Sequence, residues 1–151
     1  MKNLLQLSLL FTFVLVSCST FAQVDGTIKE KIRAKQGDKM LLVINYVKAE
    51  VKEDYMKFME EVFFDAVVHS NTPLLQEQHR KTRWLLPQGQ NEDQSWTFVY
   101  LMDPLVEEGD YQFPSVLQEK YTKEKVEALM KQYDAYLAAP PKIYPLIQSK
   151  Y

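Results

Sequence analysis

The chain has 151 residues; 46% of them are hydrophobic, 25% are charged, and the formal net charge at pH 7 is −2. A chain of this length can form one domain with its own hydrophobic core. The weak negative charge argues against a general attraction to nucleic acid or to anionic lipid, so we expect no nucleic-acid partner.

The first 22 residues have the composition of an export signal. Lys2 precedes an apolar run at residues 4–16, and small and polar residues follow it. The run is shorter than the roughly 20 residues that cross a bilayer, so a cleaved signal fits better than a permanent transmembrane helix. The sequence therefore predicts an exported protein, either periplasmic or secreted.

Two processing points compete within this segment. Thr20, Phe21 and Ala22 before Gln23 satisfy the small-residue rule for ordinary cleavage, whereas residues 15–18 (LVSC) resemble the lipobox of bacterial lipoproteins, in which Cys18 becomes the acylated first residue. We favour simple cleavage before Gln23; a lipid anchor at Cys18, attaching the protein to the cell envelope, is the alternative. Because Cys18 is the only cysteine, disulfides, thiol catalysis and cysteine metal ligands are excluded from the folded body in either case.

Residues 23–39 are mostly polar and are predicted to form a spacer before a folded domain at residues 40–151. Hydrophobic periodicity and turn signals divide this domain into elements. Four strands are predicted at residues 40–47, 81–86, 95–102 and 143–150, and the second and third form a hairpin. Two long helices are predicted at residues 54–70 and 122–138, and Thr122 caps the second. Two short helices are also predicted. One starts at Pro73 after a cap at Asn71 or Thr72, and the other is capped by Ser115 with Gln118.

The order strand, helix, strand, strand, helix, strand predicts an α+β domain of the ferredoxin-like type, βαββαβ, with an antiparallel sheet in the order 4-1-3-2. Pro145 in the last strand, and Lys81 and Arg83 in the second, are typical of sheet edges. Both central strands are apolar on both faces, yet helices cover only one face of such a sheet. We therefore expect a second copy of the chain to cover the other face in a homodimer.

The element order, the strand MLLVINYV leading into DYMKFMEEVF, and the segment WTFVYLMD before the second helical region resemble the dimeric α+β barrel superfamily, which contains antibiotic-biosynthesis monooxygenase-like proteins. The resemblance covers residues 40–150. It implies two ferredoxin-like sheets packed face to face, with a site between the sheet and the helices of one subunit or inside the barrel. Members include cofactor-free oxygenases, haem-degrading enzymes, lyases and proteins without known activity, so fold alone does not select a function.

Several kinds of chemistry are disfavoured by the residues themselves. The haem-degrading branch resembles this chain least, because its members use a histidine of the second helix as iron ligand and residues 116–138 contain none. His69 and His79 are ten residues apart and lack the spacing of a recognised metal site. Phosphate loops, serine elbows and HExxH motifs are also missing from the sequence. We expect neither a metal nor a cofactor.

An aromatic, sparsely polar surface remains as the candidate site. Because they are smaller, Thr97, Val99 and Leu101 are predicted to face the helices. That places a larger set on the open face of the sheet: Trp96, Phe98, Tyr100 and Met102, beside Leu42, Ile44 and Tyr46. Such a surface suits a flat hydrophobic ligand, with Tyr46 and Tyr100 orienting its polar atoms, Trp96 as a wall, and Arg83 or His79 stabilising an enolate or carboxylate at the rim. Alternatively, the aromatic residues fill a dimer core and Arg83 only solvates an edge strand.

Two functions from different classes follow. The first is an exported homodimer that binds a small aromatic ligand or is purely structural, which fits the lack of a catalytic motif. The second is a cofactor-independent, monooxygenase-like enzyme, which fits the family resemblance and the aromatic surface. A packed interior between the subunits would favour the first, and an empty cavity near Tyr46 and Tyr100 would favour the second.

Overall fold

The computed structural model describes residues 33–150. The predicted export signal, Cys18 and most of the predicted spacer lie outside the described residues. No helix within residues 33–150 is long and apolar enough to span a membrane.

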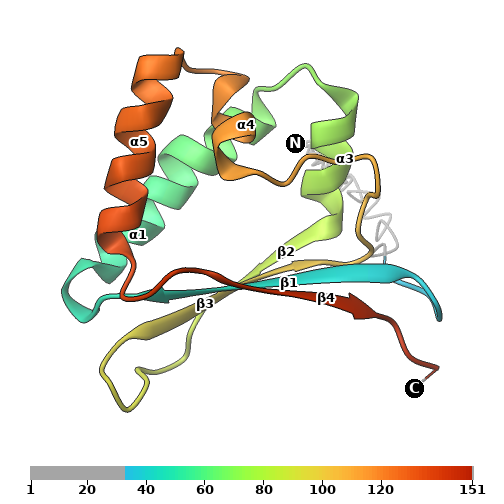
Figure 1. Ribbon diagram of the computed structural model, residues 1–151, viewed down its shortest axis with the longest axis horizontal. Coiled ribbons are helices and arrows are strands. Elements are labelled where there is room, and N and C mark those ends of the chain that lie inside the picture. The colour runs from blue at the N-terminus through green and yellow to red at the C-terminus, as the bar shows by residue number, and fades with distance from the viewer. Residues whose placement is uncertain (1–32, 151) are drawn as a thin grey trace, which may run out of the picture. The chain divides into compact units, whose positions relative to one another are not determined.

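One four-stranded antiparallel sheet forms the base of the domain, and the helices lie together on one of its sides (Figure 1). Its strands are β1 (Lys39–Val47), β2 (Thr82–Leu85), β3 (Trp96–Met102) and β4 (Lys142–Ile147). Their spatial order, β2-β3-β1-β4, is the predicted one, so the ferredoxin-like α+β fold is confirmed. Pro145 and Arg83 do lie on edge strands, whereas Lys81 ends the preceding helix and not the strand.

The first helical region is less regular than its apolar stripe predicts. It consists of the 3₁₀ turn η1 (Ala49–Val51), α1 (Lys52–Phe58), the π-helical turn η2 (Met59–Phe64) and α2 (Asp65–Val68). A π turn holds one residue more per turn than the α-helix, and such turns are frequent at functional sites. Here it places two adjacent aromatic residues, Phe63 and Phe64, on the wall of one cavity.

Three more helices complete the layer: α3 (Pro73–Lys81), α4 (Phe113–Gln118) and α5 (Lys123–Tyr136). The predicted start at Pro73 is correct, but α3 is a full helix that runs directly into β2. Thr122 caps α5 as predicted, since its hydroxyl accepts a hydrogen bond from the Lys125 amide at 3.4 Å. The predicted cap at Ser115 is wrong: the cap is Gln112, three residues earlier, because Pro114 favours the first turn and places Ser115 inside the helix.

The prediction of which sheet face meets the helices is also wrong. Tyr46 pairs with Thr97 and Ile44 with Val99, so these smaller β3 residues share the open face with the even-numbered residues of β1. The helix side carries the larger side chains, and its buried members are Asn45, Val47, Phe98, Tyr100 and Met102. Size misled the prediction because a protein interior is packed to crystal-like density by residues of any size that fit together, so side-chain size alone does not identify the buried face.

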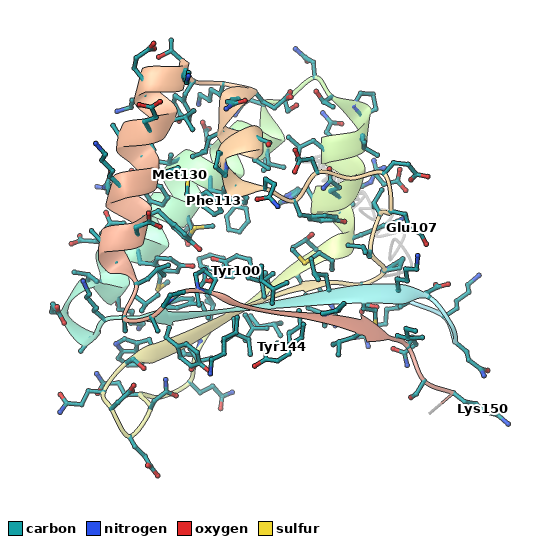
Figure 2. All side chains as sticks on the ribbon, viewed as in Figure 1. Tyr100, Glu107, Phe113, Met130, Tyr144 and Lys150 are labelled. Carbon is teal, nitrogen blue, oxygen red and sulfur yellow. The ribbon has the colours of Figure 1, made fainter. Side chains whose placement is uncertain are left out.

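Figure 2 shows this division, with Tyr100 directed toward the helices and Tyr144 of β4 on the other side of the sheet. The core on the helix side joins β1 and β3 to α1 and α5 through buried Tyr55, Phe98 and Tyr133. On the open side, Tyr144 and Leu146 are 43% and 41% exposed.

Candidate functional site

A cavity of about 100 Å³ lies between the helix-facing side of the sheet and the helices. Much of its lining is apolar or aromatic, and includes Val43, Phe63, Phe64, Phe113 and Val116. Polar groups reach it from Asn45 of β1, Tyr100 of β3, Tyr133 of α5, and Gln78 and His79 of α3. A dry cavity of about 150 Å³ is enough for benzene in a protein core. The site therefore approaches the size of a single planar ring.

Stacked aromatic rings form one wall of the cavity. The Phe63 and Phe113 rings lie 4.1 Å apart between centroids at an interplanar angle of 23°, and Phe113 stacks in turn on Tyr133 at 4.4 Å. Phe64, adjacent in the π turn, packs on Trp84 of β2 at 5.1 Å. These contacts connect the π turn to the sheet and to α5, so the wall is held on several sides.

Four polar residues form a buried hydrogen-bonded cluster beside this wall. Asn45 is only 1% exposed, and its Nδ2 donates to the hydroxyl of Tyr55 at 2.8 Å and to that of Tyr133 at 2.7 Å. The Tyr55 and Tyr100 hydroxyls are hydrogen-bonded at 2.6 Å. The Asn45 Oδ1 atom is buried and has no partner among the described residues.

The cluster carries more hydrogens than these bonds use. An asparagine amide and three phenols provide five donor hydrogens, and the three hydrogen bonds among them use three. Turning the Asn45 amide over would exchange its donors and acceptor but would leave the same surplus of two. A buried donor without an acceptor is costly. Asn45, Tyr100 and Tyr133 line the cavity, so the surplus hydrogens lie beside its interior.

Burial keeps these phenols protonated. It raises the pKa of Tyr55 to about 12, and it raises the pKa of Tyr133 and of Tyr100 above the ordinary value, with the neighbouring Tyr55 adding to the effect at Tyr100. The groups therefore remain hydrogen-bond donors at neutral pH. Two such donors beside one cavity can stabilise a carbonyl or a phenolate oxygen.

His79 adds a base to the same cavity. It lies in the last turn of α3, lines the cavity, and packs against Phe64 with ring centroids 5.9 Å apart. Partial burial lowers the pKa of His79 below its ordinary 6.5, because it disfavours the charged form. The imidazole is therefore neutral at pH 7 and can accept a proton.

The cavity includes two of the five predicted ligand-binding residues, Tyr100 and His79. The prediction that Tyr46 and Tyr100 share a site is wrong, because strand register places them on opposite faces. Tyr46 instead lies in an open hollow with residues 90–93 and carries the Lys142 ammonium 5.1 Å from its ring centroid.

The remaining predicted residues, Trp96 and Arg83, do not line the cavity. Trp96 faces the helices at the end of β3, where the Lys52 ammonium lies 4.5 Å from its ring centroid. Arg83 forms an ion pair with Asp103, which is 3% exposed and also accepts the Ala34 amide hydrogen at 2.7 Å. Both side chains are used in packing or pairing with other parts of the domain.

Sequence reasoning missed Asn45, Tyr55 and Tyr133 as site residues. Tyr55 and Tyr133 have the spacing of core positions, and nothing local marks their hydroxyls as partners. Asn45 did carry a signal, because it is the only amide within the apolar strand MLLVINYV. A buried amide in a central strand requires polar partners. No group of His, Cys, Asp and Glu side chains within residues 33–150 could hold a metal ion.

No family model and no curated protein matches the chain. Among solved structures, it is similar to a 1.35 Å crystal structure of a Caulobacter crescentus protein that carries the provisional name antibiotic biosynthesis monooxygenase. The two chains are 15% identical with a TM-score of 0.38, and the match covers 75% of this chain and 91% of that one. At this distance, the site has to be interpreted from its own residues.

Proposed function

We propose that the protein binds a small planar aromatic compound with hydroxyl or carbonyl oxygens in the cavity between the sheet and the helices. The observation that carries this proposal is the surplus of two hydrogen-bond donors, together with the unpaired Asn45 Oδ1, beside an aromatic wall. A hydroxylated ring would pack on Phe113 while its oxygens pair with the cluster. Export, with cleavage before Gln23, remains part of the proposal.

The test uses hydroquinone as probe and titration calorimetry as readout. We expect Tyr100→Phe and Tyr133→Phe each to weaken hydroquinone binding about tenfold, since a lost hydrogen bond of about 1.4 kcal/mol changes the dissociation constant tenfold. Tyr46→Phe is the matched control, because it removes a phenol from the opposite face. Wild-type protein that binds no hydroquinone at millimolar concentration, or a Tyr46→Phe variant weakened as much as the others, would contradict the proposal.

A second candidate function is cofactor-independent oxidation of the bound compound, and the position of His79 favours it. Its neutral imidazole could accept the proton of a ligand hydroxyl, while the phenols of the cluster stabilise the resulting phenolate. Oxidation by O₂ would then convert hydroquinone to benzoquinone: hydroquinone loses two electrons and two protons, and O₂ takes them up to become hydrogen peroxide. Oxygen uptake with hydroquinone tests this step: we expect His79→Gln to abolish uptake while calorimetry still detects binding. Wild-type protein that binds hydroquinone without consuming oxygen would limit the function to binding.

We also propose that a second copy of the chain covers the open face of the sheet. Val99 and Leu101 of β3 lie on this face with Leu42 and Ile44 of β1. Tyr144 of β4 extends it, since it pairs with Leu42. A continuous apolar sheet face of this kind is costly to leave in water. A symmetry-related copy of the same face would bury it in a homodimer.

A further inference from the structure

A second cavity, of about 180 Å³, adjoins the first on the side of α3 and α4. Four residues line both cavities and therefore separate them: Leu75 and Gln78 of α3, Asp110, and Val116 of α4. Two of these, Leu75 and Val116, belong to a small buried apolar cluster with Val67, which fixes that part of the partition. The other part depends on polar contacts of Gln78, which interacts with the Tyr111 side chain and with the loop before α4.

One of these contacts joins Gln78 to the loop before α4. The Gln78 side chain is 4% exposed, and its Nε2 donates to the main-chain oxygen of Asp110 at 3.0 Å. The side chain lies directly over Gly109, where an added Cβ would come within 2.6 Å of Gln78 Cδ and Nε2. Gln78 thus fills the space between the two cavities only because residue 109 has no side chain.

The two cavities differ in chemistry. The inner one has the aromatic wall and the phenol cluster, whereas the outer one combines leucine and valine side chains with hydroxyl and carboxylate groups from Thr72, Glu108, Ser115 and Glu119. The Glu119 carboxylate accepts hydrogen bonds from Ser70 Oγ at 2.8 Å and Thr72 Oγ1 at 2.6 Å, and these bonds hold its pKa below the ordinary value. The outer cavity therefore suits a substituent that donates hydrogen bonds and disfavours an anionic one.

We propose that the Gln78 side chain is the movable part of this partition and determines the length of ligand that the protein accepts. With Gln78 in place, the inner cavity, of about 100 Å³, is limited to a ligand no larger than one ring. When the side chain is displaced or removed, the two cavities join, and a longer ligand can place its ring in the inner cavity and a hydroxyl-bearing extension in the outer one. This inference rests on the proposed function, because it needs the inner cavity to bind a ring.

The experiment compares hydroquinone with 4,4′-dihydroxybiphenyl by titration calorimetry. We expect Gln78→Ala to bind the biphenyl about tenfold or more tightly than the wild type does. Gln76→Ala is the matched control: Gln76 lies on the same helix and donates to the main-chain oxygen of Ser70 at 2.7 Å, but it lines neither cavity. It should change neither affinity.

A second variant covers the case in which Gln78→Ala does not fold. Gly109→Ala retains Gln78 but forces its side chain away from Asp110, so it should also raise biphenyl affinity, by less than Gln78→Ala does because the added methyl group occupies part of the opened space. The role of Gln78 as a partition is overturned, while the proposed function stands, in either of two cases. Gln76→Ala gains biphenyl affinity, or a folded Gln78→Ala or Gly109→Ala variant still binds hydroquinone but gains no biphenyl affinity. If the wild type binds neither compound, the proposed function fails and the partition fails with it.

Discussion

Replacement of Asn45 by leucine separates a binding role of the buried polar cluster from a purely structural one. Leucine has nearly the same size, so packing in the central strand should be retained. The change removes the two hydrogen bonds from Nδ2 to Tyr55 and Tyr133, and it also removes the unpaired Oδ1 atom. The two losses have opposite effects on the free energy of unfolding.

Their magnitudes can be compared. Two buried hydrogen bonds contribute about 1 kcal/mol each, whereas a buried polar atom without a partner costs about 1–3 kcal/mol. The Tyr133 hydroxyl also loses the partner that Asn45 provided, which costs about another 1–3 kcal/mol, so the free energy of unfolding without ligand should fall by about 2 kcal/mol. Hydroquinone should bind about tenfold more weakly or worse, because the amide that orients the phenols and offers an acceptor is gone.

Urea unfolding and calorimetry on the same samples measure both quantities. Asn91→Leu is the control, since its Nδ2 also donates to two hydroxyls, Ser95 Oγ at 2.8 Å and Thr97 Oγ1 at 2.9 Å, but its Oδ1 is paired with Thr97 Oγ1 at 3.1 Å. We expect this control to lose about 2 kcal/mol of stability without any change in binding. An Asn45→Leu variant that loses more than about 3 kcal/mol and binds hydroquinone like the wild type would refute the binding role.

Two further predictions concern the sheet faces and the phenols. Val99→Glu should give a folded monomer in light scattering, because Val99 lies on the open face of the sheet. Phe98→Glu should not fold, because Phe98 is fully buried under the helices. A wild-type monomer at micromolar concentration would contradict the dimer. Burial raises the pKa of Tyr55 to about 12 from an ordinary 10, so the folded state keeps the Tyr55 proton to a higher pH than the unfolded state does. The contribution of this group to the free energy of unfolding is therefore full below pH 10 and is lost as the pH rises toward 12, by roughly 3 kcal/mol. Urea unfolding between pH 9 and pH 11 should show a smaller decline in Tyr55→Phe, and an equal decline would contradict this assignment.

Hydrophobic periodicity was sufficient to predict the fold. The continuous apolar run of β1, the hairpin turn before β3 and the stripe of α5 each have one dominant local interpretation, and their order leaves few topologies. Pro145 then selected the edge strand, because a proline removes one ladder hydrogen bond. These signals are local in sequence, and the sheet order follows from them.

The site could not be predicted in the same way, because both faces of the central strands are apolar. Alternation along β3 separates Phe98 and Tyr100 from Val99 and Leu101 but does not say which set meets the helices. The answer depends on groups from far along the chain: Tyr133, 88 positions after Asn45, completes the amide's hydrogen bonds. The π turn adds a second difficulty, since it changes the face on which Phe64 lies without any change in composition.

With Phe98 and Tyr100 facing the helices, the two faces of the sheet have separate proposed roles, ligand binding on one and dimerisation on the other. On the helix side, the cavity proposed to bind the ligand is lined by residues of one chain, so the proposed site would not need a partner subunit. On the open side, none of the residues proposed to contact a second copy lines that cavity, although both sets lie on the same strands. Val99→Glu should therefore change the oligomeric state without weakening hydroquinone binding, whereas Tyr100→Phe should weaken binding about tenfold and leave the oligomeric state unchanged. If both properties failed together in either variant, the site would have to lie between subunits rather than within one.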